Sequence, residues 1–120
     1  MKNKTLVLGA SENPERYSNK AILKLVSKGN DVVAIGKKAG YVNGVEIMTE
    51  AIQDNDIETV TLYLNPTHQI PYYDYILSLK PKRIIFNPGT ENDDLERLAA
   101  REGINVLESC TLVMLSTGQY

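Results

Sequence analysis

KTLVLGASENPERYS, residues 4–18, is the stretch that decides the fold of this 120-residue chain. Its apolar run at residues 5–8 reads as a short buried strand, and the strand leads directly into a turn of small residues, Gly9, Ala10 and Ser11. A strand that ends in such a turn and is followed by a helical pattern is typical of the start of a parallel α/β sheet. Backbone N–H groups in a small-residue turn, with the positive end of the next helix, can bind a phosphate. The stretch therefore predicts an anionic ligand over this turn.

Strand and helix patterns alternate along the rest of the chain. We expect further strands at residues 31–35, 59–64, 83–86 and 104–107, with a short extended segment at residues 41–47. We expect helices at residues 19–28 after an N-cap at Ser18, near 49–53, from about 70 to 80, and at 91–102 after an N-cap at Thr90. Alternation of this kind predicts an α/β fold, with a mostly parallel, doubly wound sheet of about five or six strands in three layers.

The composition limits the class of protein. With 120 residues, 42% of them hydrophobic, we expect one domain over residues 1–120 with a single core. The net charge of −2 gives no general attraction to nucleic acid, and no clustered basic face is present. The amino-terminal apolar run is too short for a signal sequence or a membrane-spanning helix. These features predict a soluble, cytoplasmic protein that binds neither nucleic acid nor membrane.

The loops that follow the strands are expected on one edge of the sheet. Since parallel strands all end at the same edge, topology places four loops together, and the crevice where the strand order reverses is the usual ligand site of such sheets. The residues concerned are Gly9, Ala10, Ser11, Gly36, Lys37, Lys38, Asn65, Pro66, Thr67, Asn87, Pro88 and Gly89.

Basic residues in two of these loops indicate a phosphorylated, nucleotide-type ligand. Arg16 can hold a diphosphate through two hydrogen bonds of its planar guanidinium group. Lys37 and Lys38 stand where NAD-binding proteins commonly carry an acidic residue for the ribose 2′-hydroxyl, and a lysine suits a phosphate on that ribose. The candidates are therefore CoA and NADP, although the GxGxxG spacing of dinucleotide-binding turns is absent. A solvated charged turn is the alternative interpretation of the two lysines.

Candidates for catalysis are few. His68 has no partner carboxylate at a suggestive spacing, and Ser11 lacks the GxSxG context of a hydrolase nucleophile. Cys110 is either a small buried core residue or a thiol near the ligand, where it could form a mixed disulfide with a CoA thiol under oxidation. One cysteine forms no internal disulfide, and no Cys/His cluster surrounds His68. We predict no catalytic residue and no metal site, and the sequence favours a binding protein over an enzyme.

Three segments, in this order and at these distances, resemble a known family. They are LVLGASENPERYSNKA at residues 6–21, IIFNPGTENDDLERLAAREGI at 84–104 and ESCTLVMLSTGQ at 108–119. The chain resembles the small stand-alone CoA-binding proteins, which are similar to the amino-terminal, Rossmann-like CoA-binding domain of the succinyl-CoA synthetase α subunit. The resemblance implies coenzyme A or an acyl-CoA as the ligand. It implies no ligase activity, because the synthetase's other domains do not fit into 120 residues.

The resemblance also implies roles for the loop residues. In this family the first turn holds the CoA diphosphate, which here carries over to Gly9, Ala10, Ser11 and Arg16. The loop after the second strand faces the ribose phosphate, which matches Gly36, Lys37 and Lys38. The third loop, Asn65-Pro66-Thr67, would lie near the adenine and pantetheine path, and Asn87, Pro88 and Gly89 would border the far end. One departure is that many relatives carry an Asn-Pro pair where this chain has Gly36-Lys37.

Three functions are therefore compared. The first is a CoA or acyl-CoA binding protein that acts as a carrier, a sensor or the partner of another enzyme. The second is an NADP-binding oxidoreductase or reductase subunit, against which stand the absent GxGxxG and the lack of a substrate domain. The third is an interaction module without a ligand, in which the apolar run at residues 112–115 packs on a second copy and forms a homodimer.

Overall fold

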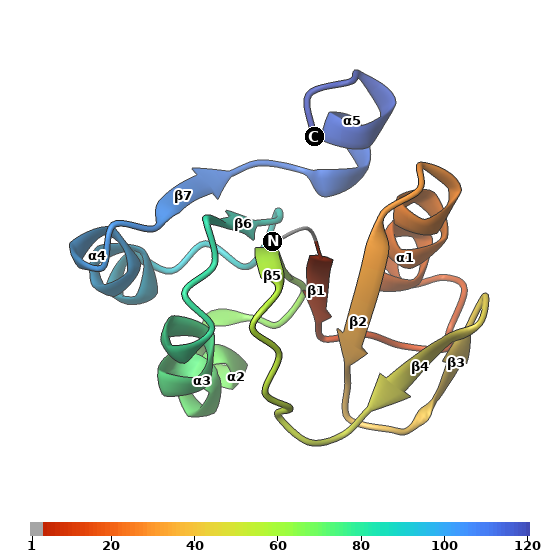
Figure 1. The fold of residues 1–120 in the computed structure, drawn as a ribbon, viewed down its shortest axis with the longest axis horizontal. Coiled ribbons are helices and arrows are strands. Elements are labelled where there is room, and N and C mark those ends of the chain that lie inside the picture. Colours follow the sequence, from red (N-terminus) through yellow and green to blue (C-terminus); the bar gives the residue numbers. More distant parts are fainter. Residues whose placement is uncertain (1–3) are drawn as a thin grey trace.

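A seven-stranded sheet organises the computed structural model, which describes residues 4–120 (Figure 1). The sheet has the order β3-β4-β2-β1-β5-β6-β7, and neighbouring strands run parallel except β3 and β4. The strands are β1 (Lys4–Leu8), β2 (Asp31–Ile35), β3 (Gly40–Val42), β4 (Val45–Met48), β5 (Ile57–Leu62), β6 (Arg83–Phe86) and β7 (Asn105–Glu108). The predicted doubly wound α/β class is confirmed, with more strands than the five or six expected.

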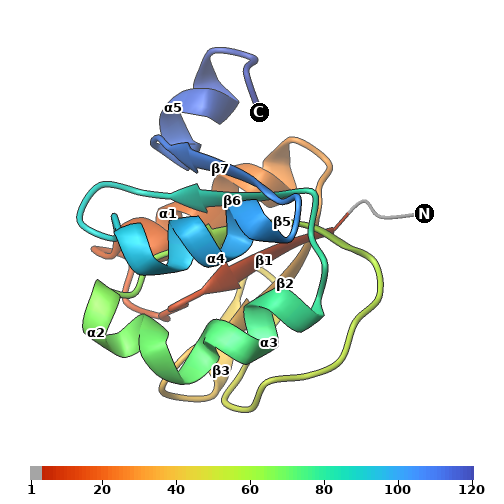
Figure 2. The same cartoon turned by 90° about the vertical axis from the view of Figure 1, so that its left-hand side faces the viewer.

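Helices cover both faces of this sheet, so that the protein has three layers. One face carries α1 (Tyr17–Ser27) and α5 (Thr111–Ser116). The other carries α2 (Pro66–Gln69), the 3-10 helix η1 (Ile70–Tyr72), α3 (Tyr73–Ser78) and α4 (Asp93–Arg101), which Figure 2 shows in front of the strands. Alternate residues of the central strand serve the two layers: Leu6 and Leu8 pack in the core under α3 and α4, whereas Val7 packs in the core under α1.

The helix after the first turn begins one residue before its predicted N-cap. Arg16 is the N-cap of α1, with no side-chain hydrogen bond to the helix, and Ser18 lies inside the first turn. The predicted N-cap at Ser18 is therefore wrong, and the Ser18 hydroxyl does not cap the helix. Gly29 follows the helix in the left-handed conformation (φ 84°), and the N–H of Asn30 bonds the carbonyl of Leu25. That ending is the glycine stop expected from the sequence.

Residues 40–48 form a hairpin, β3 and β4, where one extended segment was expected. Asn43 (φ 48°) and Gly44 (φ 84°) both adopt positive φ, as an Asn-Gly hairpin turn requires. The helix expected near residues 49–53 does not form, and that prediction is wrong. Tertiary contacts hold the segment extended instead: Lys4 pairs with Asp54 at 3.0 Å, and the Tyr75 hydroxyl donates to the carbonyl of Ile52 at 2.6 Å.

Two helix starts also differ from the predicted ones. The helical segment after β5 begins at Pro66 and not near residue 70, because Asn65 caps α2 by accepting the N–H of His68. Helix α4 is capped by Asn92 and not by Thr90, since the Asn92 side chain accepts the N–H groups of Asp94 and Leu95. Helix propensity alone does not separate such neighbouring polar residues, and their hydrogen bonds decide the cap.

The carboxyl-terminal segment forms α5, which packs beside α1. Met114 and Leu115 are buried in the protein's own core, whereas Val113 is 55% exposed. Two of the four residues in the apolar run expected at a subunit contact are therefore buried within the chain. Among residues 4–120, no helix has the length and apolar character that a membrane span needs.

Candidate functional site

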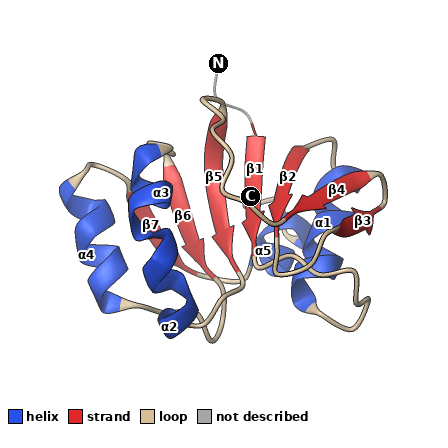
Figure 3. Ribbon diagram, turned by 90° about the horizontal axis from the view of Figure 1, so that it is seen from below, coloured by secondary structure: helices blue, strands red, loops and turns tan. Residues whose placement is uncertain are grey.

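A groove of about 1240 Å³ runs along the carboxyl edge of the parallel strands. Figure 3 shows this edge, where the strand arrowheads meet the loops. The order of the sheet reverses at β1, whose neighbours are β2 and β5, so the groove lies at the topological switch point. All the predicted site residues line it except Pro66 and Asn87. The structure thus brings the four predicted loops together, and their contact with a ligand remains a prediction.

The loops after β1 and β2 are packed backbone to backbone. The N–H groups of Gly9 and Ala10 both donate to the carbonyl of Ile35, at 2.8 and 2.9 Å. A Cβ on Gly36 would lie 2.2 Å from the carbonyl oxygen of Ala10, which makes glycine necessary there. The N–H groups of Gly9 and Ala10 therefore hold the two loops together and are not free for a phosphate.

Unpaired donors lie one step further along the same loop. Within the described part of the chain, the N–H groups of Ser11 and Glu12 have no partner, and neither do those of Tyr17 and Ser18 at the start of α1. Asn13 shapes the loop between them: its N–H donates to Ser11 Oγ, and its side-chain oxygen accepts the N–H of Glu15. The loop and the helix start thus contribute four backbone donors, all from residues that line the groove.

Ser18 adds a hydroxyl to these donors. The residue as a whole is 3% exposed and lines the groove, and its hydroxyl makes no hydrogen bond to any residue between 4 and 120. Next to it, Asn19 donates to the carbonyl of Ser11 at 3.0 Å and fixes the loop against the helix. A hydroxyl that lines a groove at a helix N-terminus, without a partner in the described residues, suits an anion that completes its hydrogen bonds.

The charged side chains of the groove are of both signs. Arg16, Lys37 and Lys38 are exposed and make no ion pair within residues 4–120. Glu12 and Glu15 also line the groove, and sequence reasoning did not single them out. Glu12 is held in place because one carboxylate oxygen accepts the N–H of Tyr41 at 2.9 Å. That bond ties the loop after β1 to β3.

Asn87 stabilises the carboxyl edge from within. Its side chain is buried and donates to Thr61 Oγ1 at 2.7 Å and to the carbonyl of Leu62 at 2.9 Å. Its side-chain oxygen accepts the N–H of Thr111, the first residue of α5, at 2.9 Å. Asn87 therefore ties β5, β6 and α5 together, and Pro88 and Gly89, the next two residues, present their surfaces to the groove.

The part of the groove formed by the loops after β5 and β6, here called its far half, is more apolar. Tyr63, Leu64, Pro71 and Tyr72 line it, together with the exposed His68. The Tyr63 hydroxyl is buried and has no hydrogen-bond partner in the described residues, and burial raises its pKa to about 12. Cys110 is half-buried and does not line the groove. Sequence reasoning missed Leu64 and Pro71 because they precede or follow the polar loop positions on which it relied.

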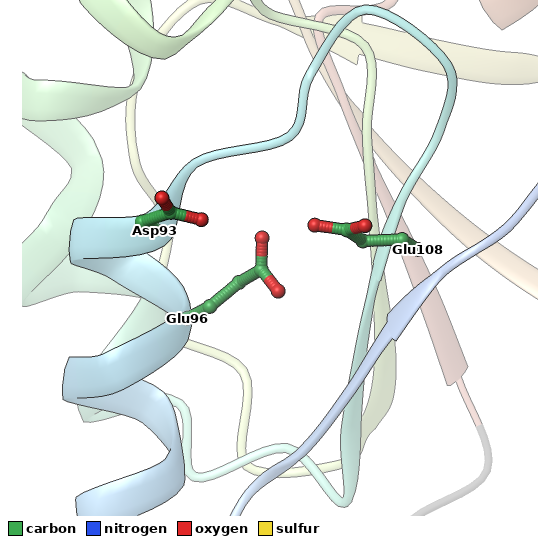
Figure 4. Close-up of side chains that lie close together, drawn as sticks. All are labelled: Asp93, Glu96 and Glu108. Carbon is green, nitrogen blue, oxygen red and sulfur yellow. The ribbon is translucent and has the colours of Figure 1, made fainter.

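Three carboxylates form a separate cluster between α4 and β7 (Figure 4). Asp93, Glu96 and Glu108 point toward one another, and each offers an oxygen within 4.8 Å of the others. Burial, followed by the neighbouring Glu108, raises the pKa of the Glu96 carboxyl group above its usual value. None of the three residues lines the groove.

Solved structures share this fold over most of their length. A crystal structure described as an uncharacterized protein is 48% identical, with a TM-score of 0.96 and coverage of 100% of this chain and 99% of that one. A hypothetical protein from Pyrococcus horikoshii OT3 is 25% identical (TM-score 0.86; 97% of this chain, 83% of that one).

A larger enzyme contains a similar fold as one part. The dinucleotide-forming acetyl-coenzyme A synthetase 1 of Ca. Korarchaeum cryptofilum is 19% identical, with a TM-score of 0.70. The likeness covers 90% of this chain and 26% of the synthetase chain. No curated protein matches the chain. The sequence pattern of the CoA binding domain matches residues 3–116, nearly the whole length. The chain therefore belongs to the CoA binding domain family.

Proposed function

We propose that the protein binds coenzyme A or an acyl-CoA in the groove at the carboxyl edge. Membership of the CoA binding domain family supports a ligand of this class. The observation that carries the assignment to this groove is the set of donors at the start of α1 that have no partner in residues 4–120, above all the Ser18 hydroxyl. Arg16, which makes no ion pair within the same residues, lies next to it. A diphosphate supplies the acceptors and the negative charge that these groups lack.

The four loops divide the ligand between them in this proposal. The diphosphate lies over Ser11, Glu12 and Ser18, with Arg16 beside it. The phosphorylated ribose lies toward Lys37 and Lys38, whose ammonium groups have no ion-pair partner in residues 4–120. The pantetheine then runs along the far half of the groove.

That far half offers the surface a pantetheine arm needs. The third and fourth loops contribute Asn65, Thr67, Pro88 and Gly89, and the apolar side chains of Leu64, Pro71 and Tyr72 lie among them. Amide groups of the arm can bond the exposed backbone of the loops, and its methylene groups can pack on the apolar side chains.

The proposed role is binding, with bond-making chemistry left to another protein. The acetyl-coenzyme A synthetase, in which a similar fold makes up about a quarter of the chain, illustrates how such a domain can serve inside an enzyme. In this role the protein would act as a carrier, as a sensor, or as the partner of an enzyme that resembles a CoA synthetase. A homodimer is compatible with each of them.

Parallel calorimetric titrations test the ligand class. The purified protein is titrated with CoA, acetyl-CoA, dephospho-CoA and NADPH. We expect CoA and acetyl-CoA to bind, dephospho-CoA to bind more weakly because it lacks the ribose phosphate, and NADPH to bind weakly or not at all. Tight binding of NADPH with no binding of CoA overturns the proposal in favour of an NADP-dependent oxidoreductase. Binding of none of the four, by protein shown to be folded, overturns it in favour of an interaction module.

A further inference from the structure

Gln69 is a fully buried amide that lies behind the wall of the groove without touching it. Its side-chain nitrogen donates to two carbonyl groups, that of Leu64 at 2.8 Å and that of Thr90 at 2.8 Å. Its side-chain oxygen accepts a hydrogen bond from Asn92 at 2.8 Å. Both N–H groups and the oxygen of this buried amide are therefore hydrogen-bonded, and the three partners belong to three different residues of the chain.

The orientation of the Gln69 amide is determined by the helix that follows. The side-chain oxygen of Asn92 accepts the N–H groups of Asp94 and Leu95 at the start of α4, so its nitrogen must face the other way. That nitrogen donates to Gln69 Oε1 and to the Tyr73 hydroxyl, at 2.8 and 2.7 Å. Gln69 Nε2 is thereby directed at the carbonyl groups of the two loops.

The two carbonyl groups belong to different loops of the groove. Leu64 follows β5 and Thr90 follows β6, and both line the groove. Thr67 and His68, which also line it, directly precede Gln69 on α2. One buried side chain therefore sets the spacing of the loops after β5 and β6 and the placement of α2 between them.

We infer that Gln69 is a positioning residue for the part of the ligand that lies beyond the diphosphate. This inference rests on the proposed function. The loops after β1 and β2, which would hold the diphosphate and the ribose phosphate, make no hydrogen bond to Gln69. A change at Gln69 therefore alters the far half of the groove and leaves the nucleotide half in place.

Two probes separate these halves. CoA spans both, whereas adenosine 3′,5′-bisphosphate occupies only the nucleotide half, because it carries the ribose phosphate and one phosphate of the diphosphate and has no pantetheine. In Gln69→Glu a carboxylate faces the carbonyl groups of Leu64 and Thr90 and repels them. We expect the Kd for CoA to rise about tenfold or more, and the Kd for the bisphosphate to change less than about threefold. A general loss of stability does not change the ratio of the two dissociation constants.

A second variant, Asn92→Asp, tests the same inference in case the Gln69→Glu protein does not fold. In Asn92→Asp the new carboxylate still accepts the N–H groups of α4, so the helix cap is kept, but it cannot donate to Gln69 Oε1. The Gln69 amide then loses the group that orients it, and the Kd ratio shifts in the same direction. Tyr75→Phe is the matched control, because it removes one hydroxyl hydrogen bond, to Ile52, away from the groove. It leaves the ratio unchanged.

The outcomes distinguish failure of the positioning role of Gln69 from failure of the proposed CoA binding. If the wild-type protein binds CoA and the bisphosphate but Gln69→Glu and Asn92→Asp leave the ratio of Kd values at its wild-type value, Gln69 has no positioning role. If the folded wild-type protein binds neither probe, the proposed function itself is wrong.

Discussion

Gly36 and Ala10 are in contact through their backbones: a Cβ at residue 36 would lie 2.2 Å from the Ala10 carbonyl oxygen. This approach joins the turn after β1 to the turn after β2, and Ile35 reinforces it by accepting the N–H groups of Gly9 and Ala10. The relative placement of the two loops proposed for the phosphates therefore depends on the absence of one methyl group.

Substitution of Gly36 by alanine should separate these loops. The new methyl group would clash with a backbone oxygen, which cannot rotate away as a side chain can. We therefore expect the free energy of unfolding to fall by about 1–3 kcal/mol. CoA affinity should fall as well, since the loops no longer face each other correctly. Denaturant unfolding and calorimetric titration measure the two effects. Lys38→Ala is the control, because that exposed side chain makes no ion pair within residues 4–120 and its removal should lower affinity without lowering stability. Equal stability of Gly36→Ala and wild type would contradict the packing described.

Ser18→Ala should weaken ligand binding without destabilising the protein. The Ser18 hydroxyl has no partner in the described residues, so its loss breaks no hydrogen bond within them. A hydrogen bond to a phosphate contributes about 1.5 kcal/mol, which corresponds to roughly tenfold in Kd for CoA. Ser27→Ala, on the same helix, is the matched control: its exposed hydroxyl bonds the carbonyl of Lys24 and lies at the other end of α1. An unchanged CoA affinity in Ser18→Ala would remove Ser18 from the site.

Asn87→Ala should destabilise the protein without weakening CoA binding, which is the reverse of the effect expected for Ser18→Ala. It leaves the carbonyl of Leu62 and the N–H of Thr111 without their partner inside the protein, and a buried unpaired group costs about 1–3 kcal/mol of stability. Under conditions where the variant is folded, CoA affinity should change little, because Asn87 does not line the groove. Thermal unfolding and titration check both statements. A strong loss of affinity with unchanged stability would show that Asn87 contacts the ligand.

The stability of the protein should fall as Glu96 ionises. Burial and the nearby Glu108 raise the pKa of Glu96 above its reference value of 4.5, so the folded state binds this proton more tightly than the unfolded state. The contribution of Glu96 is therefore fully present below pH 4.5 and is lost as the pH rises through the raised pKa. We expect Glu96→Gln to be more stable than wild type at neutral pH, by about 0.2–1 kcal/mol, the scale of solvent-screened charge pairs.

Unfolding measured from acid to neutral pH, with a chelator present to remove divalent cations, checks this expectation. The difference between Glu96→Gln and wild type should shrink as the pH falls. Glu102→Gln, an exposed residue at the other end of α4, is the control. If Glu96→Gln is less stable than wild type at neutral pH, the three carboxylates do not repel one another.

The sequence predicted the groove better than it predicted how the groove is held together. The position of the loops follows from topology, because parallel strands end at one edge, and that placed Lys37, Thr67 and Gly89 correctly on the groove. The buried roles of Asn87 and Gln69 depend on which side chains tertiary packing brings near them, and no local pattern carries that information. The hairpin turn at residues 43–44 did carry a local signal, its Asn-Gly pair.

A two-dimensional NMR titration of the backbone amides with CoA tests the central claim most directly. The account predicts the largest shifts at Ser11, Glu12, Tyr17 and Ser18, whose N–H groups have no partner in the described residues, and at the loop after β2. The N–H groups of Gly9 and Ala10 should stay bonded to Ile35 and remain protected from hydrogen exchange. An absence of shifts at saturating CoA, or shifts confined to another face of the protein, would contradict the account.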